Sequence, residues 1–165
     1  MWLSDRRNTL LALVALAALT ACGFAPAYGP SGQADKLLGA ILVDAPETRD
    51  DQLLVRQIET RLGRADLPRY ALGYDLKVVE ERMAVSATNI TTRFNLVGSV
   101  RYALRDTDTG DILTTGTVSH FTGYSTTGTT VATLAAERDA HERLSSILAD
   151  QIVARLIAAS PDLPE

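Results

Sequence analysis

Alternation of apolar and polar residues is clearest between Phe94 and Arg105, where every second residue except Gly98 is apolar. A period of two predicts a strand with one buried and one wetter face. The polar run 106–111 follows, in which Gly110 can adopt a positive φ, and a Thr- and Val-rich strand is predicted from Ile112 to Phe121. Two strands joined by a short turn predict an antiparallel hairpin.

Two further segments are predicted to be strands. Apolar and polar residues alternate from Tyr74 to Val78, and the alternation slips at 79–81, which predicts a β-bulge there. The apolar run 40–43 is bounded by Gly39 and Pro46, so a short strand is expected before the others.

Two segments show the helical period instead. Between Gln52 and Leu62 apolar residues recur four apart, with Asp50 or Asp51 as the predicted N-cap and Gly63 as the stop. A second helix of about 28 residues, about 40 Å long, is predicted from Val131 to the Ser160-Pro161 pair, after a polar loop at 122–130. Its predicted buried stripe is Leu134, Leu144, Ile147, Leu148, Ile152, Leu156 and Ile157. Because this helix is longer than a small sheet needs, one end is expected to project or to meet a partner.

The predicted order β-α-β-β-β-α indicates an α+β fold. The amphipathic patterns favour a two-layer sandwich, in which a small, mainly antiparallel sheet of about four strands carries two helices on one face. The other face of the sheet is then exposed or covered by something else.

The length of 165 residues fits one domain, and a content of 46% apolar and 22% charged residues excludes a wholly disordered chain.

The N-terminus has the pattern of an export signal. Arg6 and Arg7 precede a run from Leu10 to Ala21 that is apolar except for Thr20, and this run is too short to span a bilayer. It ends in Leu-Thr-Ala-Cys, which resembles a bacterial lipobox with Cys22 as the lipidated residue. We therefore predict a signal peptide at 1–21, a lipidated cysteine with a flexible tether at 22–38, and a single domain at 39–165. The alternative is a plain signal peptide beside a buried free cysteine.

Lipidation of Cys22 implies a location. The sulfur takes a diacylglycerol and the new amino group takes a third acyl chain, a palmitate, and three chains hold a protein on a membrane essentially permanently. Gly23 stands where an Asp favours inner-membrane retention in many Gram-negative bacteria. The expected location is the outer membrane, facing the periplasm.

The sequence shows little sign of catalytic chemistry. It lacks the glycine-rich, metalloprotease and nucleophile-elbow motifs, and its single cysteine is assigned to lipid. We expect no cofactor, no metal and no catalytic residue; a hydrolase would need His120 or His141 to face a nucleophile. The net charge of −4 and the 5% content of aromatic residues argue against a nucleic-acid partner.

Four basic residues are predicted to lie on strands. Arg93, Arg101 and Arg105 are separated by even numbers of residues, so they share one face of a strand, and Lys77 lies on the polar side of its neighbour. Guanidinium groups bind phosphates through paired hydrogen bonds. The stripe could therefore bind an anionic lipid head group, or it could be an ordinary solvated face with cross-strand ion pairs.

The chain resembles the LptE family of outer-membrane lipopolysaccharide-assembly lipoproteins, in its alphaproteobacterial form. The resemblance rests on the element order and on three segments, CGFAPAYG at 22–29, AERDA at 136–140 and LADQIV at 148–153. It implies a non-enzymatic protein that plugs and helps assemble the large β-barrel LptD and assists insertion of lipopolysaccharide into the outer leaflet. Two alternatives remain: an auxiliary lipoprotein of another envelope lipid-transport complex, such as an ABC system, and a lipid-anchored periplasmic hydrolase.

Overall fold

The computed structural model describes residues 34–85 and 91–164. The chain divides into two compact units, Met1–Asp35 and Lys36–Glu165, and the description below concerns the second. The predicted signal peptide, Cys22 and the tether up to residue 33 lie outside the described residues.

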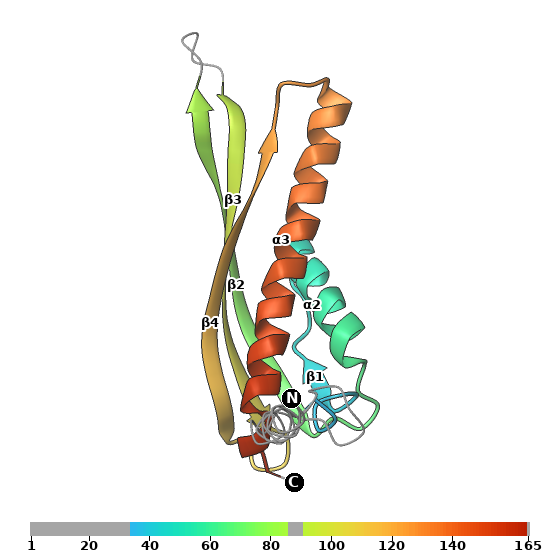
Figure 1. The fold of residues 1–165 in the computed structure, drawn as a ribbon. Helices are drawn as coiled ribbons and strands as arrows, with labels where there is room; N and C mark the ends of the chain where they lie inside the picture. The colour runs from blue at the N-terminus through green and yellow to red at the C-terminus, as the bar shows by residue number, and fades with distance from the viewer. Residues whose placement is uncertain (1–33, 86–90, 165) are drawn as a thin grey trace, which may run out of the picture. The chain divides into compact units, whose positions relative to one another are not determined.

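The second unit is a four-stranded open sheet with two helices on one face (Figure 1). Strand β1 (Ile41–Val43) pairs in parallel with β2 (Tyr70–Val85). Strand β2 is antiparallel to β3 (Thr91–Asp106), which is antiparallel to β4 (Ile112–Ser125). Helix α2 (Arg49–Leu62) follows β1, and α3 (Thr130–Ala159) follows β4 and ends in the 3₁₀ turn η1 (Ser160–Asp162). The predicted α+β architecture and its hairpin are confirmed.

Strand β2 is longer than predicted, and the predicted bulge at 79–81 is wrong. Val79 pairs with Val97 in regular register, and the register shifts lie further on, between Arg82 and Ala84 and between Ala84 and Val85. The alternation slips because an apolar residue, Val79, occupies the exposed face of the sheet. Strand β4 likewise continues past its predicted end, because Thr122 is buried and its hydroxyl donates to the carbonyl of Ala140.

Helix α2 begins earlier than predicted, and neither Asp50 nor Asp51 is its N-cap. Thr48 is the cap: its hydroxyl accepts a hydrogen bond from the Asp51 N–H at 3.2 Å, and the Asp51 carboxylate accepts from the Thr48 N–H at 2.9 Å. This reciprocal pair is a capping box. Gly63 ends the helix with φ 78°, as predicted.

Helix α3 has 30 residues, and its N-terminal end is the one that extends beyond α2 (Figure 1). Leu134, placed in the buried stripe by its spacing, is 47% exposed because it lies in this end, so that prediction is wrong. Further along, α3 approaches the sheet closely at Gly98, where a Cβ would lie 2.9 Å from a methyl group of Leu148. A larger residue at position 98 would therefore force the Leu148 side chain to shift where the helix crosses β3.

The unit has two parts, which differ in how many elements pack on the sheet. We call residues 36–77, 99–119 and 142–164 the base, in which both helices and β1 pack on the sheet. We call residues 78–85, 91–98 and 120–141 the extension, in which the strands continue beyond α2 and only the first turns of α3 accompany them (Figure 1). A contact of 2.7 Å between Asp50 Oδ1, near the start of α2, and His141 Nδ1 lies at the junction of the two parts.

Candidate functional site

The four predicted basic residues share the face of the sheet that points away from the helices. Leu96, Val100 and Leu104 are buried against the helices, so the odd-numbered residues of β3 occupy the opposite face. All four side chains on this open face are exposed: Lys77, Arg93, Arg101 and Arg105. They form a line rather than a cluster, since Arg93 and Arg101 are eight residues apart, about 26 Å along a strand.

Their electrostatic surroundings differ. Arg101 forms an ion pair with Asp75, which is opposite it on β2, and its Nε donates to Asp75 Oδ2 at 3.2 Å. This hydrogen bond raises the pKa of Arg101 above its usual value. The cross-strand pair is the arrangement expected of an ordinary solvated face. Lys77 and Arg93, in contrast, form no ion pair with any residue in 34–83 or 92–164.

Arg101 and Arg105 line an open hollow of about 310 Å³ on the base. Asp44 and Asp75 line the same hollow, so it has both positive and negative side chains. Gly73 forms part of its floor, and a Cβ there would lie 3.1 Å from a carboxylate oxygen of Asp44. The mixture of charges favours polar contacts in this region over the binding of a free anion.

The sequence reasoning missed an apolar hollow on the open face of the extension. Its volume is about 430 Å³, and its lining residues are Glu81, Met83, Asn95, Val97, Ser119, His120 and Phe121. The available signal was the presence of Val79 and Val97 at positions that the strand period assigns to the solvent face.

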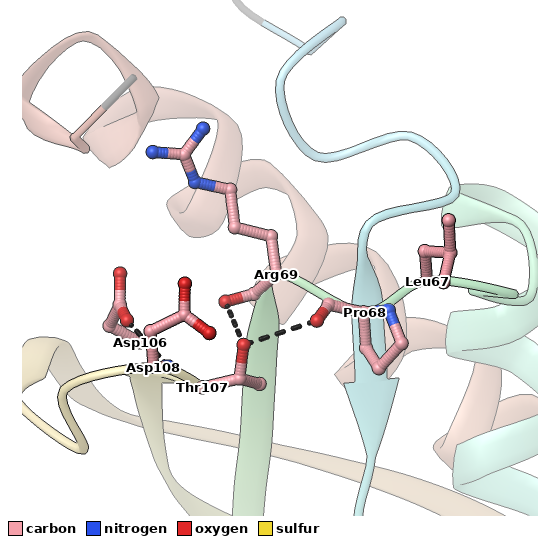
Figure 2. Close-up of a pocket in the computed structure, with 6 residues that line it drawn as sticks. All are labelled: Leu67, Pro68, Arg69, Asp106, Thr107 and Asp108. Carbon is pink, nitrogen blue, oxygen red and sulfur yellow. Dashed lines mark hydrogen bonds between the residues drawn. The ribbon is translucent and has the colours of Figure 1, made fainter.

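A second hollow, of about 440 Å³, lies in the base between the loop before β2 and the turn after β3 (Figure 2). Its lining residues are Leu67, Pro68, Arg69, Asp106, Thr107 and Asp108. The hydroxyl of Thr107 donates to the carbonyls of Pro68 at 3.1 Å and Arg69 at 2.8 Å, which fixes the two loops together. Backbone N–H groups of Thr109 and Asp108 lower the pKa of Asp106. None of the predicted site residues lies here.

The two histidines do not form a catalytic arrangement in the described residues. His141 is held by Asp50, and His120 stacks on Phe121 with ring centroids 5.8 Å apart. No hydrogen bond joins either ring to a serine or threonine hydroxyl in 34–83 or 92–164. The same part of the chain holds no group of three or more His, Cys, Asp or Glu side chains suited to a metal ion.

Two tyrosines have perturbed hydroxyls on the helix side of the sheet. Burial, followed by the charges of Asp51, Asp44 and Glu47, raises the pKa of Tyr74 to about 12, and its buried hydroxyl has no partner among the described residues. In the extension, Tyr124 donates to Glu80 at 2.6 Å and stacks on Phe94 at 5.4 Å. Burial and this hydrogen bond raise the pKa of Tyr124. Both phenols therefore stay neutral at physiological pH.

The fold is a two-layer α+β domain in which both described helices lie on the same face of the sheet. The family model for LptE, described as lipopolysaccharide-assembly, matches residues 38–156. The chain belongs to the LptE family, as the resemblance in its sequence predicts. No curated protein sequence matches it significantly.

Solved structures with the same fold include three bacterial proteins described as lipoproteins. One from Caulobacter crescentus CB15 is 28% identical, with a TM-score of 0.64 over 80% of this chain and 98% of that one. Rare lipoprotein B from Shewanella oneidensis is 10% identical, with a TM-score of 0.57 over 74% and 96%. A minor lipoprotein from Acinetobacter baumannii is 19% identical, with a TM-score of 0.53 over 72% and 89%. The last two show the fold alone.

The family match supports the general class of lipopolysaccharide-assembly lipoprotein. Among the helices that the structure describes, none combines the length and the apolar character needed to cross a bilayer.

Proposed function

We propose that the chain is a lipoprotein that acts without catalysis in an outer-membrane lipopolysaccharide translocon. In this proposal Cys22 carries the lipid anchor on the periplasmic side. The folded unit plugs and helps assemble an LptD-type β-barrel and assists insertion of lipopolysaccharide into the outer leaflet. The observation that carries the proposal is the family match over 38–156, which spans both helices and the whole sheet except the last residues of α3.

The character of the open face supports a plug role. Large barrels of the outer membrane have polar interiors. The middle of the open face is correspondingly polar, with in-register rows of Lys77, Ser99 and Ser119 and of Asp75, Arg101 and Thr117. The Asp75–Arg101 pair can exchange water for the polar groups of a barrel wall without leaving the charge of Arg101 unpaired, because Arg101 already has a counter-ion.

Lipopolysaccharide contact is assigned in this proposal to the basic residues of the open face, Lys77, Arg93, Arg101 and Arg105. The two without a described ion pair, Lys77 and Arg93, can approach lipid A phosphates at the lowest cost, because no existing interaction has to break. Arg101 can contribute only the donors that Asp75 leaves free.

Affinity purification of the tagged full chain from detergent-solubilised envelopes tests the partner. We expect a large outer-membrane barrel in equal amount, identified by mass spectrometry. The Cys22→Ser variant should leave the membrane fraction, because a chain without the acyl groups loses its anchor. Recovery of inner-membrane transporter subunits in place of the barrel would assign the chain to a different lipid-transport complex.

Charge reversal tests the lipid contact separately. Replacing Arg93 and Arg101 together with Glu should reduce retention of purified lipopolysaccharide, while Arg138→Glu, an exposed change on α3, serves as the control. Unchanged retention in the double variant would remove the basic residues from the proposed function.

A further inference from the structure

Three apolar side chains lie in one row across the open face of the extension. Val79 on β2 is directly opposite Val97 on β3, which is directly opposite Phe121 on β4. Because adjacent strands are about 4.8 Å apart, the row spans about 10 Å. Val79 is 43% and Phe121 60% exposed, and Met83, which lines the same hollow as Val97 and Phe121, is 56% exposed.

The fold does not require this row. Both helices lie on the opposite face, so these side chains contribute nothing to the core that joins sheet and helices. Val97 and Phe121 of the row line the hollow, and exposed apolar surface of this kind is typical of an interaction site. The polar residues that line the hollow are Glu81, Asn95, Ser119 and His120.

Charge is distributed unequally on the two sides of the row. Toward the base, the next row on this face contains Lys77, Ser99 and Ser119 and holds no carboxylate. Toward the hairpin tip, the next row contains the carboxylate of Glu81 with Asn95 and Gly123. An anionic group beside an apolar chain in the row is therefore favoured on the Lys77 side and repelled on the Glu81 side.

We propose that the row Val79–Val97–Phe121 binds an alkyl chain of lipopolysaccharide, lying across the strands with a phosphate of the lipid near Lys77. This inference rests on the proposed function and deepens it, since it assigns the acyl part of the lipid to one place on the sheet. An alkyl chain suits the row because it needs no hydrogen bonds, and the charge pattern matches an anionic amphiphile. A protein segment on the same row is the competing occupant.

Photo-crosslinking in cells tests the occupant in the intact assembly. Phe121 is replaced by photoreactive benzoylphenylalanine in the full chain, and the adducts are probed for lipopolysaccharide and for protein. Ile112 is the matched control, because it lies on the same strand, is also 60% exposed and pairs with Arg105 on the open face of the base. We expect lipopolysaccharide adducts from position 121 and few from position 112. Protein adducts alone at 121 would overturn the proposal.

Binding measurements on the purified full chain separate this inference from the proposed function. Phe121→Ser should weaken affinity for lipopolysaccharide about tenfold, since a phenyl contact with the chain is lost, while Ile112→Ser leaves it unchanged. Equal affinity of wild type and Phe121→Ser would overturn the alkyl site and leave lipopolysaccharide binding intact. Absence of binding by the wild type would defeat the proposed lipid contact itself, and the alkyl site with it.

Deacylated lipopolysaccharide and a charge variant complete the test. Deacylated ligand should bind wild type and Phe121→Ser equally, because it lacks the chain that contacts the row. Lys77→Gln should weaken binding of the intact lipid and make it less sensitive to salt, whereas Arg138→Gln, at an exposed position on α3, should not. Binding of deacylated and intact ligand with the same affinity would contradict the proposal.

Discussion

The base and the extension share the same three long strands but are held together by different interactions. In the part of the chain that the structure describes, eleven of the twelve largest fully buried side chains belong to the base, and only Leu96 belongs to the extension. Polar contacts add to the few buried apolar side chains of the extension: Thr122 to the Ala140 carbonyl, Arg143 of the base to the Gly123 carbonyl, and Tyr124 to Glu80.

This difference separates stability from contact surface. Burial of large apolar side chains is the main favourable term in folding, so the base supplies most of the stability. The extension can expose Val79, Met83 and Phe121 at little cost, because its strands are already fixed by the pairing that continues from the base. The comparison predicts that stability and lipid binding respond to different substitutions.

The largest expected effect comes from one leucine in each part of α3. Leu156 in the base is fully buried, and Leu156→Ala should cost about 2–5 kcal/mol of unfolding free energy through lost burial and a cavity. Leu134 in the extension is half-exposed, and Leu134→Ala should change stability by about 0.5 kcal/mol or less. Urea denaturation followed by circular dichroism measures both. Equal losses would mean that the first turns of α3 are as tightly packed as the base.

A smaller effect is expected where α2 and α3 are joined in the base. Arg61 of α2 forms an ion pair with Asp150 of α3 and donates to Ser146 Oγ at 2.9 Å. Arg61→Met keeps much of the side-chain volume and removes these bonds, so we expect a loss of about 1–2 kcal/mol. Thermal melting at two salt concentrations checks it.

Arg64→Met is the matched control for this prediction. Among the residues that the structure describes, Arg64 forms an ion pair only with Glu59 on its own segment, and it is exposed to solvent, so its removal should leave the melting temperature unchanged. If Arg64→Met lowered the melting temperature as much as Arg61→Met, the effect of Arg61→Met could not be assigned to its bonds between α2 and α3.

The order of the elements and much of the base could be predicted from the sequence, because local residue patterns specify turns and helix ends. The hairpin at 106–111 is specified by local turn chemistry, with Gly110 at φ 78°. The helix stop at Gly63 is equally local. The capping box was missed because Thr48 lies two residues before a pair of aspartates that could each cap a helix.

The open face was predictable only in part. Strand parity places Arg93, Arg101 and Arg105 on one face, and the structure confirms that placement. The Asp75–Arg101 pair and the row through Val97 depend on the register between strands, which no local pattern specifies. The apolar row of the extension could therefore not be predicted from one strand at a time.

A still smaller effect is expected for the hydroxyl of Tyr124, which tests the polar contacts of the extension. Tyr124→Phe removes the 2.6 Å hydrogen bond to Glu80 and keeps the stacking on Phe94, so we expect a loss of about 0.5–1.5 kcal/mol at pH 7. Glu80→Gln keeps an acceptor and should cost less.

The pH dependence of Tyr124 has a definite sign. Burial first, and Glu80 second, raise the pKa of the phenol above its ordinary value of 10.0. A raised pKa means that the stabilisation is fully present below pH 10 and is lost as the pH rises above it. Melting curves between pH 7 and pH 11 measure this loss. The melting temperature of the wild type should exceed that of Tyr124→Phe at pH 7, and this difference should shrink above pH 10. A difference in melting temperature that stays constant up to pH 11 would contradict this account.

The smallest expected effect lies at the far end of the base, in the turn after β3. Asp106 accepts hydrogen bonds from the backbone N–H groups of Asp108 at 2.8 Å and Thr109 at 3.0 Å, and these bonds lower its pKa below the ordinary 3.8. A lowered pKa means that the stabilisation is present above pH 3.8 and is lost as the pH falls through the folded-state value. Asp106→Ala should lower the melting temperature slightly at pH 7, and the difference should vanish in strong acid. Asp108→Ala keeps both backbone donors and should show no such trend; a difference between wild type and Asp106→Ala that persists in strong acid would mean that the carboxylate charge does not stabilise the turn.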